Sequence, residues 1–276
     1  MLAARFITAL VLLAVFCSAL VLLPNGYWSA ALLVALFVAA LEWAQLVGYR
    51  SRMRLVFVAL VLAIAVALLR QEGHGESIAG KFDAFFFGLA LLFWAAVAPV
   101  WLARQWRPRN PLVLGVTGGV VLLPTWLALA RMQATPTQLL LVLGIVWIAD
   151  TAAYVIGRRM GRRALARHIS PGKTWEGVIG AVAAVAVYYG LLWFIFGAEM
   201  SLQEAVIGVA MFAAVTALSV EGDLFESWMK RQAGFKDSGT LLPGHGGILD
   251  RIDGLTASLP IAALWLHYLG RPGVLA

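Results

Sequence analysis

One charged window, residues 219–254, decides how this chain is interpreted. It reads SVEGDLFESWMKRQAGFKDSGTLLPGHGGILDRIDG. Long apolar runs flank it on both sides, yet it holds six of the fourteen acidic residues of the protein. A membrane protein places so many charges at a bilayer boundary when they bind something charged. We therefore expect a binding site here rather than a loop of solvated charges.

The first part of the window, residues 220–232, is predicted to be helical. On such a helix Asp223, Ser227 and Lys230 share one face, which presents an acid, a hydroxyl and a cation. Glu226 and Lys230 are four residues apart, so part of this charge is explained by ordinary pairing within a helix.

The second part begins after Gly234, the predicted C-terminal cap of that helix. It contains a glycine-rich turn, residues 242–247, in which glycines allow positive φ and expose backbone N–H groups. Asp250 and Asp253 follow, three residues apart and so on one face of the next helix. Paired carboxylates beside such a turn and several cations suit a divalent metal that carries a phosphorylated ligand.

A second polar stretch, residues 150–177, starts inside an apolar segment. Asp150 precedes Arg158 by two helical turns and is therefore expected about 10 Å inside the boundary. A carboxylate in lipid normally has a function or a partner. For Asp150 the alternative to a functional role is a structural hydrogen bond to a neighbouring helix. The segment 170–174, SPGKT, ends like a Walker phosphate-binding loop but lacks its first glycine and preceding strand. A P-loop fold is excluded, although Lys173 and its hydroxyl neighbours still suit phosphate binding.

Both stretches resemble the phosphatidate cytidylyltransferases, also called CDP-diacylglycerol synthases. The downstream pattern is Ser227-x-x-Lys230-Arg231-x4-Lys236-Asp237-x5-Leu242-Pro243-Gly244-His245-Gly246-Gly247-x2-Asp250-Arg251-x-Asp253. The upstream pattern is D-x-x-A-Y-x-x-G from Asp150, followed by S-P-x-K-T-x-E-G from Ser170. The resemblance covers residues 150–254, and nothing is carried over to residues 1–140. It implies a membrane enzyme that joins phosphatidic acid to CTP and releases pyrophosphate.

The resemblance also implies roles for particular residues in a metal-assisted attack of the lipid phosphate on the α-phosphorus of CTP. Asp223 and Asp250 are expected to bind Mg²⁺, with Asp253 either a third ligand or a partner of Arg251 or Lys230. These five residues form the expected catalytic set. The expected substrate-binding residues are Lys173, Ser170, Thr174, Ser227, Arg231, Lys236, Asp237, His245, Gly246, Gly247 and Asp150. The expected partners are CTP and phosphatidic acid in the membrane, with no nucleic acid; a homodimer is left open.

Composition places the whole chain in lipid. It has 276 residues, of which 62% are hydrophobic and 13% charged, with a mean hydropathy of +0.88. We expect an all-α integral membrane protein, a polytopic bundle of about nine transmembrane helices. The expected spans are residues 6–23, 27–47, 55–69, 84–102, 112–130, 137–156, 177–197, 202–222 and 255–270. Residues 1–136 would hold five of them, and residues 137–276 would form a catalytic region with cytoplasmic loops 157–176 and 223–254. The third and ninth spans are short, and Pro260 predicts a kink or a tilted half-span in the ninth.

The distribution of positive charge predicts the orientation. Seventeen of the twenty-one basic residues lie at the N-terminus or in alternate connectors, and the intervening connectors collect acidic residues instead. By the positive-inside rule the N-terminus is cytoplasmic and the C-terminus exported. The charged window then lies on the cytoplasmic side of a bacterial inner membrane, where CTP is dissolved.

Two other functions fit part of the pattern. A secondary transporter would also carry intramembrane acids such as Asp150 and Glu42, but it would show paired inverted halves, whereas the charge here lies toward one face and the C-terminus. A related nucleotidyltransferase or kinase acting on an isoprenoid lipid is the second alternative, because phosphate-binding residues do not specify the acceptor lipid. Glu42, late in the second span, is interpreted as either a pocket acid or an interfacial residue, with the interfacial position favoured.

Overall fold

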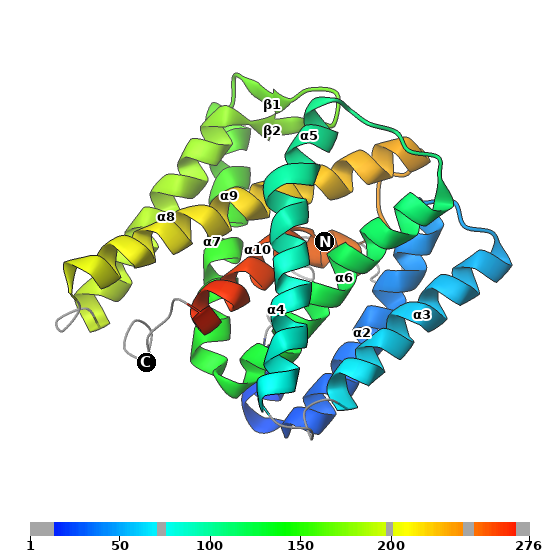
Figure 1. Cartoon of the computed structure of the whole chain (residues 1–276). Coiled ribbons are helices and arrows are strands. Elements are labelled where there is room, and N and C mark those ends of the chain that lie inside the picture. Colours follow the sequence, from blue (N-terminus) through cyan, green and yellow to red (C-terminus); the bar gives the residue numbers. More distant parts are fainter. Residues whose placement is uncertain (1–13, 71–75, 197–200, 240–245, 269–276) are drawn as a thin grey trace.

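The computed structural model describes residues 14–70, 76–196, 201–239 and 246–268. Within these ranges, seven helical segments are long and apolar enough to cross a membrane. They are Asn25–Leu46 (α2), Ser51–Arg70 (α3), Gly80–Ala103, Pro111–Ala134, Pro136–Met160 (α7), Trp175–Phe196 (α8) and Leu202–Ala233 (α9). The Gly80–Ala103 segment combines most of α4 (Glu76–Leu92) with a π-helical turn (Phe93–Val97) and α5 (Ala98–Ala103). The Pro111–Ala134 segment combines α6 (Pro111–Arg131) with a 3₁₀ turn (Met132–Ala134). The predicted all-α polytopic membrane fold is confirmed (Figure 1).

The two other predicted spans differ from these seven. The first is described only from residue 14, and residues 14–22 are helical. The ninth is the helix Leu249–Tyr268 (α10), in which every residue from 254 to 263 is buried. Figure 1 shows α10 in the middle of the bundle, where it contacts α9, α6, α4 and α7. The short final run of the sequence is therefore a core helix enclosed by the others.

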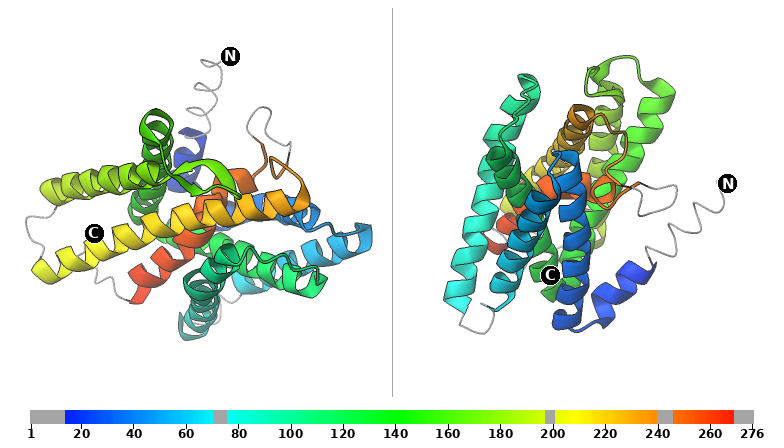
Figure 2. Two further views of the ribbon diagram at one scale, coloured as in Figure 1. Left: turned by 90° about the horizontal axis from the view of Figure 1, so that it is seen from above. Right: turned by 90° about the vertical axis from the view of Figure 1, so that its right-hand side faces the viewer.

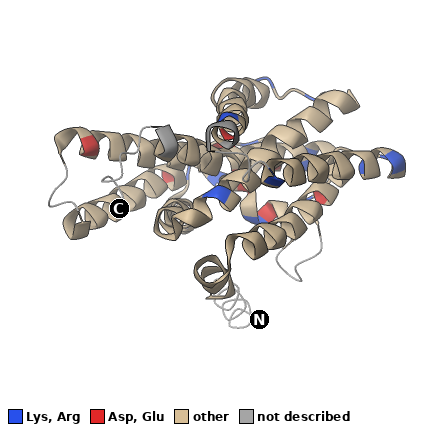
Figure 3. Ribbon diagram, turned by 60° about the horizontal axis from the view of Figure 1, so that its bottom comes forward, with Lys and Arg blue, Asp and Glu red and all other residues tan. Residues whose placement is uncertain are grey.

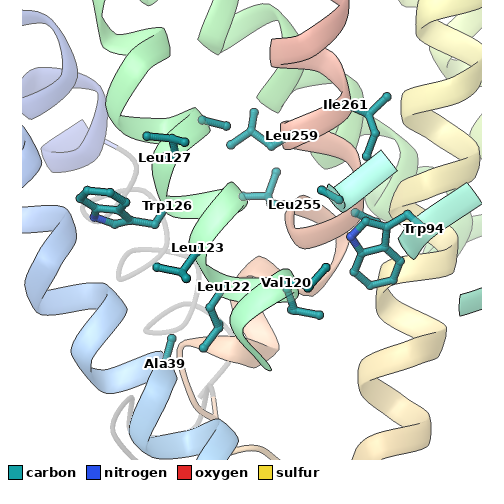
Figure 4. Close-up of a cluster of buried hydrophobic side chains, with 14 of the residues drawn as sticks. Ala39, Trp94, Val120, Leu122, Leu123, Trp126, Leu127, Leu255, Leu259 and Ile261 are labelled. Carbon is teal, nitrogen blue, oxygen red and sulfur yellow. The ribbon is translucent and has the colours of Figure 1, made fainter. Parts of the chain in front are cut away.

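The core forms where α10 and α6 cross. Figure 4 shows Leu255 and Leu259 of α10 facing the apolar side chains of α6, with Ile261 and Trp94 on the other side of α10. Leu259 and Leu127 are almost completely buried, and so is Trp94. The outer helices are different: α8 exposes most of its surface, including Phe194 at 86%. Lipid replaces water around such a surface, so an exposed apolar face is the expected one.

Helix α9 joins the bilayer to the charged window. It begins at a capping box formed by Ser201 and Glu204 and ends at Gly234, whose φ of 75° gives the predicted left-handed cap. Its 32 residues correspond to a length of about 48 Å, more than a bilayer core requires. The predicted eighth span and the predicted helix 220–232 are thus one continuous helix, visible as the long yellow to orange helix in Figure 2.

The connector at residues 157–176 is more ordered than the predicted loop. Helix α7 continues to Met160, and a β-hairpin follows, formed by strands Ala164–Ala166 (β1) and Ser170–Thr174 (β2). The strands are antiparallel, with Ala164 opposite Thr174 and Ala166 opposite Ser170. The backbone N–H of Trp175 donates to the carbonyl of Arg163 and closes the base of the hairpin. The SPGKT segment is therefore itself a strand that enters α8 directly.

Candidate active site

The charged end of α9 presents its polar residues along one side. The Ser227 hydroxyl donates to Oδ1 of Asp223 over 3.4 Å, and the ammonium of Lys230 donates to Oε2 of Glu226 over 3.0 Å. This is the face predicted from the spacing of these residues, and the pairing of Glu226 with Lys230 is confirmed. Figure 3 shows how sparsely charged residues otherwise occur along the described helices.

The hairpin places a second lysine against this face. Lys173 of β2 forms an ion pair with Oδ2 of Asp223. Asp150, on α7 beneath the hairpin, interacts electrostatically with both groups of this pair. Arg231 of α9 donates to the backbone carbonyl of Ile169 and so ties the hairpin to α9. The two stretches that were recognised separately in the sequence therefore meet at the Lys173–Asp223 ion pair.

Asp250 is held by hydrogen bonds on both of its oxygens. Its Oδ1 accepts from Lys230 over 2.6 Å, and its Oδ2 accepts from the N–H and hydroxyl of Ser238 and from the N–H of Gly247, at 2.8 to 2.9 Å. Burial alone would raise the pKa of Asp250, but the donors of Lys230, Gly247 and Ser238 together hold that pKa below its ordinary value. Asp250 is therefore an organised carboxylate that joins α9, α10 and the segment between them.

Asp253 lies one helical turn further into α10. Its carboxylate interacts electrostatically with Asp223, Glu226 and Lys173. Helices α9 and α10 approach so closely here that a Cβ on Gly222 would collide with the backbone carbonyl of Asp253. We call the assembled group the carboxylate–lysine cluster; its members are Asp150, Lys173, Asp223, Glu226, Lys230, Asp250 and Asp253.

The charge balance of the cluster bears on whether a metal ion fits there. Five carboxylates face two lysines, which leaves a formal charge of 2 − 5 = −3 when all are ionised. Carboxylate oxygens are the ligands that Mg²⁺ takes, with substrate phosphates completing its coordination. Among the described residues, no group of three or more His, Cys, Asp or Glu side chains is placed to hold a metal ion by itself. A divalent cation at this position would therefore need oxygen ligands from a phosphorylated substrate in addition to these carboxylates.

The remaining predicted site residues lie around the cluster or away from it. Thr174 accepts a hydrogen bond from the N–H of Gly177 and so caps α8, and Ser170 lies at the far end of β2. Lys236 and Asp237 are exposed on the segment after α9, and Arg251 is exposed on α10. Gly246 adopts a positive φ of 77°. His245 lies outside the described residues.

The sequence favours an interfacial position for Glu42, and this prediction is wrong because the residue is buried. This side chain of α2 is only 6% exposed, and it accepts hydrogen bonds from Ser238, Ile248 and Leu249. The only sequence signal was a single carboxylate within an apolar span. The spacing of apolar residues could not show that α2 packs against the segment between α9 and α10.

Comparison with known proteins agrees with this arrangement of motifs. A model of the cytidylyltransferase family matches residues 3–269. A phosphatidate cytidylyltransferase of Pseudomonas aeruginosa is 38% identical over 99% of this chain and 100% of its own length, and one of Haemophilus influenzae is 32% identical over 98% and 100%. A third, from Brucella abortus, is 45% identical over 51% of this chain and 50% of its own length. The match extends over the N-terminal half, where the sequence motifs alone carried no resemblance. This chain therefore belongs to the cytidylyltransferase family of membrane enzymes.

Proposed function

We propose that this protein transfers the cytidylyl group of CTP to phosphatidic acid, which yields CDP-diacylglycerol and pyrophosphate. The observation that carries the proposal is the Lys173–Asp223 ion pair, because it joins both motif-bearing stretches in one polar cluster among apolar helices. The relatives named as phosphatidate cytidylyltransferases over nearly the whole chain support this choice of substrates.

The chemistry requires two anions to meet. An oxygen of the lipid phosphate attacks the α-phosphorus of CTP, and the bond from that phosphorus to the bridging oxygen breaks as pyrophosphate leaves. Lys173 and Lys230 neutralise part of this charge and orient phosphate groups, while the carboxylates around them hold both ammonium groups in place. We assign no general base, since a phosphate monoester with a second pKa of about 6 is largely a dianion at neutral pH.

We propose Mg²⁺ as the cofactor, bound by Asp223 and Asp250 with Asp253 beside them. A bound Mg²⁺ would supply Lewis-acid stabilisation to the triphosphate and to the departing pyrophosphate. The negative charges of Asp253 and Asp223 repel each other, and a cation beside them would relieve that repulsion. Both oxygens of Asp250 already accept hydrogen bonds, so we assign this residue to the organisation of the site as well as to the cation.

The proposed location is the bacterial inner membrane, with the cluster on its cytoplasmic side. This placement rests on the concentration of basic residues in alternate connectors. It gives CTP access from the cytosol, while phosphatidic acid arrives within the bilayer.

The test is a reconstitution with purified protein. CTP labelled at its α-phosphate is incubated with Mg²⁺ and vesicles containing phosphatidic acid, and we expect labelled CDP-diacylglycerol with one pyrophosphate released per product. Diacylglycerol replaces phosphatidic acid in the control, because it lacks the attacking phosphate. Product formed with an isoprenoid phosphate but not with phosphatidic acid would support the isoprenoid alternative, and the absence of nucleotidyl transfer to either lipid would reject the proposal.

A further inference from the structure

The buried carboxylate of Glu42 connects the N-terminal half of the chain to the cluster. It lies on α2, about 200 residues before its partners in the sequence. Its Oε1 accepts from the N–H of Ile248 over 2.9 Å, and its Oε2 accepts from the N–H of Leu249 over 2.9 Å. Oε2 also lies 3.0 Å from the Ser238 hydroxyl, whose single proton it shares with Asp250. Both oxygens are thus occupied by donors from the segment that joins α9 to α10.

Two of these donors are backbone amides at the start of α10. The first amides of a helix have no acceptor within the helix itself. The carbonyl of Ile248 already accepts from the amides of Arg251 and Ile252, so the helix begins at this point. Glu42 supplies the missing acceptors from another helix, and its negative charge complements the positive end of the α10 dipole. It therefore fixes where α10 starts.

The backbone around Glu42 leaves no room for larger residues. A Cβ on Gly239 would lie 2.6 Å from Oε1 of Glu42, and a Cβ on Gly247 would collide with the same carboxylate and with the Ser238 hydroxyl. Gly247 belongs to the glycine-rich turn that the sequence predicts to expose backbone N–H groups. Its N–H instead donates to Asp250, and a side chain at this position would meet Glu42 and Ser238, so this glycine permits the approach of α2.

Ser238 carries the constraint onward to Asp250. Its hydroxyl lies 3.0 Å from Oε2 of Glu42 and 2.9 Å from Oδ2 of Asp250, and its N–H donates to the same Asp250 oxygen. Glu42 and Asp250 thus share one serine hydroxyl, and Asp250 in turn binds Lys230. Displacement of Glu42 would therefore move the carboxylate that we assign to the reaction.

We propose that Glu42 is a positioning residue that holds Asp250 in its reactive place by capping α10 and anchoring Ser238. Its role in turnover rests on the proposed function, whereas its role in holding the start of α10 does not. The two parts are therefore tested by separate measurements.

The first measurement is hydrogen exchange of the Ile248 and Leu249 amides in the full-length protein in detergent. In Glu42→Gln, either orientation of the amide group turns its NH₂ toward at least one backbone N–H, because both oxygens of Glu42 accept. We expect exchange of these two amides to rise by about tenfold or more. Glu42→Asp keeps two acceptor oxygens on a shorter side chain, so its exchange should fall between wild type and Glu42→Gln.

The second measurement is steady-state kinetics of the same variants. A small displacement of a reacting group lowers turnover strongly, so kcat of Glu42→Gln should fall by about 10²-fold. The KM for CTP should change by less than about threefold, because Lys173 and its hairpin are untouched. Glu42→Asp should recover part of kcat, and Ser238→Ala combined with Glu42→Gln should lose less than the product of the two single losses.

Asp83→Asn is the matched control. Asp83 also joins two helices through its carboxylate, which binds Arg131 at 2.8 and 3.2 Å, but it lies outside the cluster. It should leave kcat and the exchange of the Ile248 and Leu249 amides unchanged. Wild-type exchange and kcat in Glu42→Gln would overturn the inference. If wild type makes no CDP-diacylglycerol, the proposed function fails, while the exchange measurement still decides whether Glu42 holds α10.

Discussion

At the scale of single residues, the two aspartates assigned to Mg²⁺ have different surroundings. Asp223 pairs with Lys173 of β2 and accepts from the Ser227 hydroxyl of its own helix. Asp250 accepts from Lys230 and from the N–H groups of Ser238 and Gly247. Asp223 is therefore the more available ligand, and Asp250 is the one whose loss also disturbs the surrounding structure.

We predict that Asp223→Asn and Asp250→Asn each lower CDP-diacylglycerol formation by about 10²-fold or more, because each removes a charge and leaves the side-chain size unchanged. The double variant should lose little more than either single one, since residues that act as a unit are strongly non-additive. The measurement is initial rate across a Mg²⁺ titration, with monodispersity in detergent as the check on folding.

Asp83→Asn is the control for this series, because Asp83 lies outside the cluster and pairs with Arg131. Glu226 cannot serve as a control, because it lies within the cluster. Substantial activity of both single variants at ordinary Mg²⁺ would mean that the metal is bound elsewhere. Removal of Mg²⁺ with a chelator should abolish wild-type turnover, and added Mg²⁺ should restore it.

Lys173 supports a second prediction at this scale. Lys173→Ala should raise the KM for CTP by about tenfold, because it removes a cation and leaves Asp223 without its ion-pair partner. Lys173→Arg should restore little, since a planar guanidinium does not replace the compact point charge of an ammonium. An unchanged KM in both variants would restrict the hairpin to a structural role.

At the scale of elements, the crossing of α9 and α10 sets the distance between the aspartates. The crossing is close because Gly222 of α9 faces the backbone of Asp253 and the side chain of Ala257. Neither helix bears the whole site; α9 carries Asp223 and Lys230, and α10 carries Asp250 and Asp253.

We predict that Gly222→Ala destabilises the protein by about 1–3 kcal/mol, the usual range for overpacking, and lowers activity by separating the two helices. Gly190→Ala on α8 is the matched control, because the space around Gly190 is open and alanine favours a helix. Thermal unfolding in detergent measures both variants. Equal unfolding temperatures for the two would show that α9 and α10 do not depend on this contact.

At the scale of the whole molecule, the orientation in the membrane is the open prediction. In a Cys17→Ala background, a cysteine introduced by Gly273→Cys should react with an impermeant thiol reagent in intact cells, because the charge distribution exports the C-terminus. Met160→Cys, on the exposed end of α7, should react only after lysis. The reverse labelling pattern would invert the topology and place the cluster on the exported side.

The sequence by itself determined the class of fold, the position of most helices and the residues that were candidates for the cluster. Apolar runs of bilayer length have no other stable arrangement than helices, because backbone groups in lipid must pair within their own segment. The spacing of Asp223, Ser227 and Lys230 along one helix is likewise a local property, and so is the glycine cap at Gly234.

Only the tertiary structure decided which distant residues meet. The pairing of Lys173 with Asp223, the burial of α10 and the contact of Glu42 with the start of α10 all join segments far apart in the chain. Local periodicity reports which face of a helix is apolar, but here lipid and the protein core are both apolar environments. The sequence therefore could not distinguish a helix facing lipid from one enclosed by others, nor an interfacial glutamate from one buried against the start of α10.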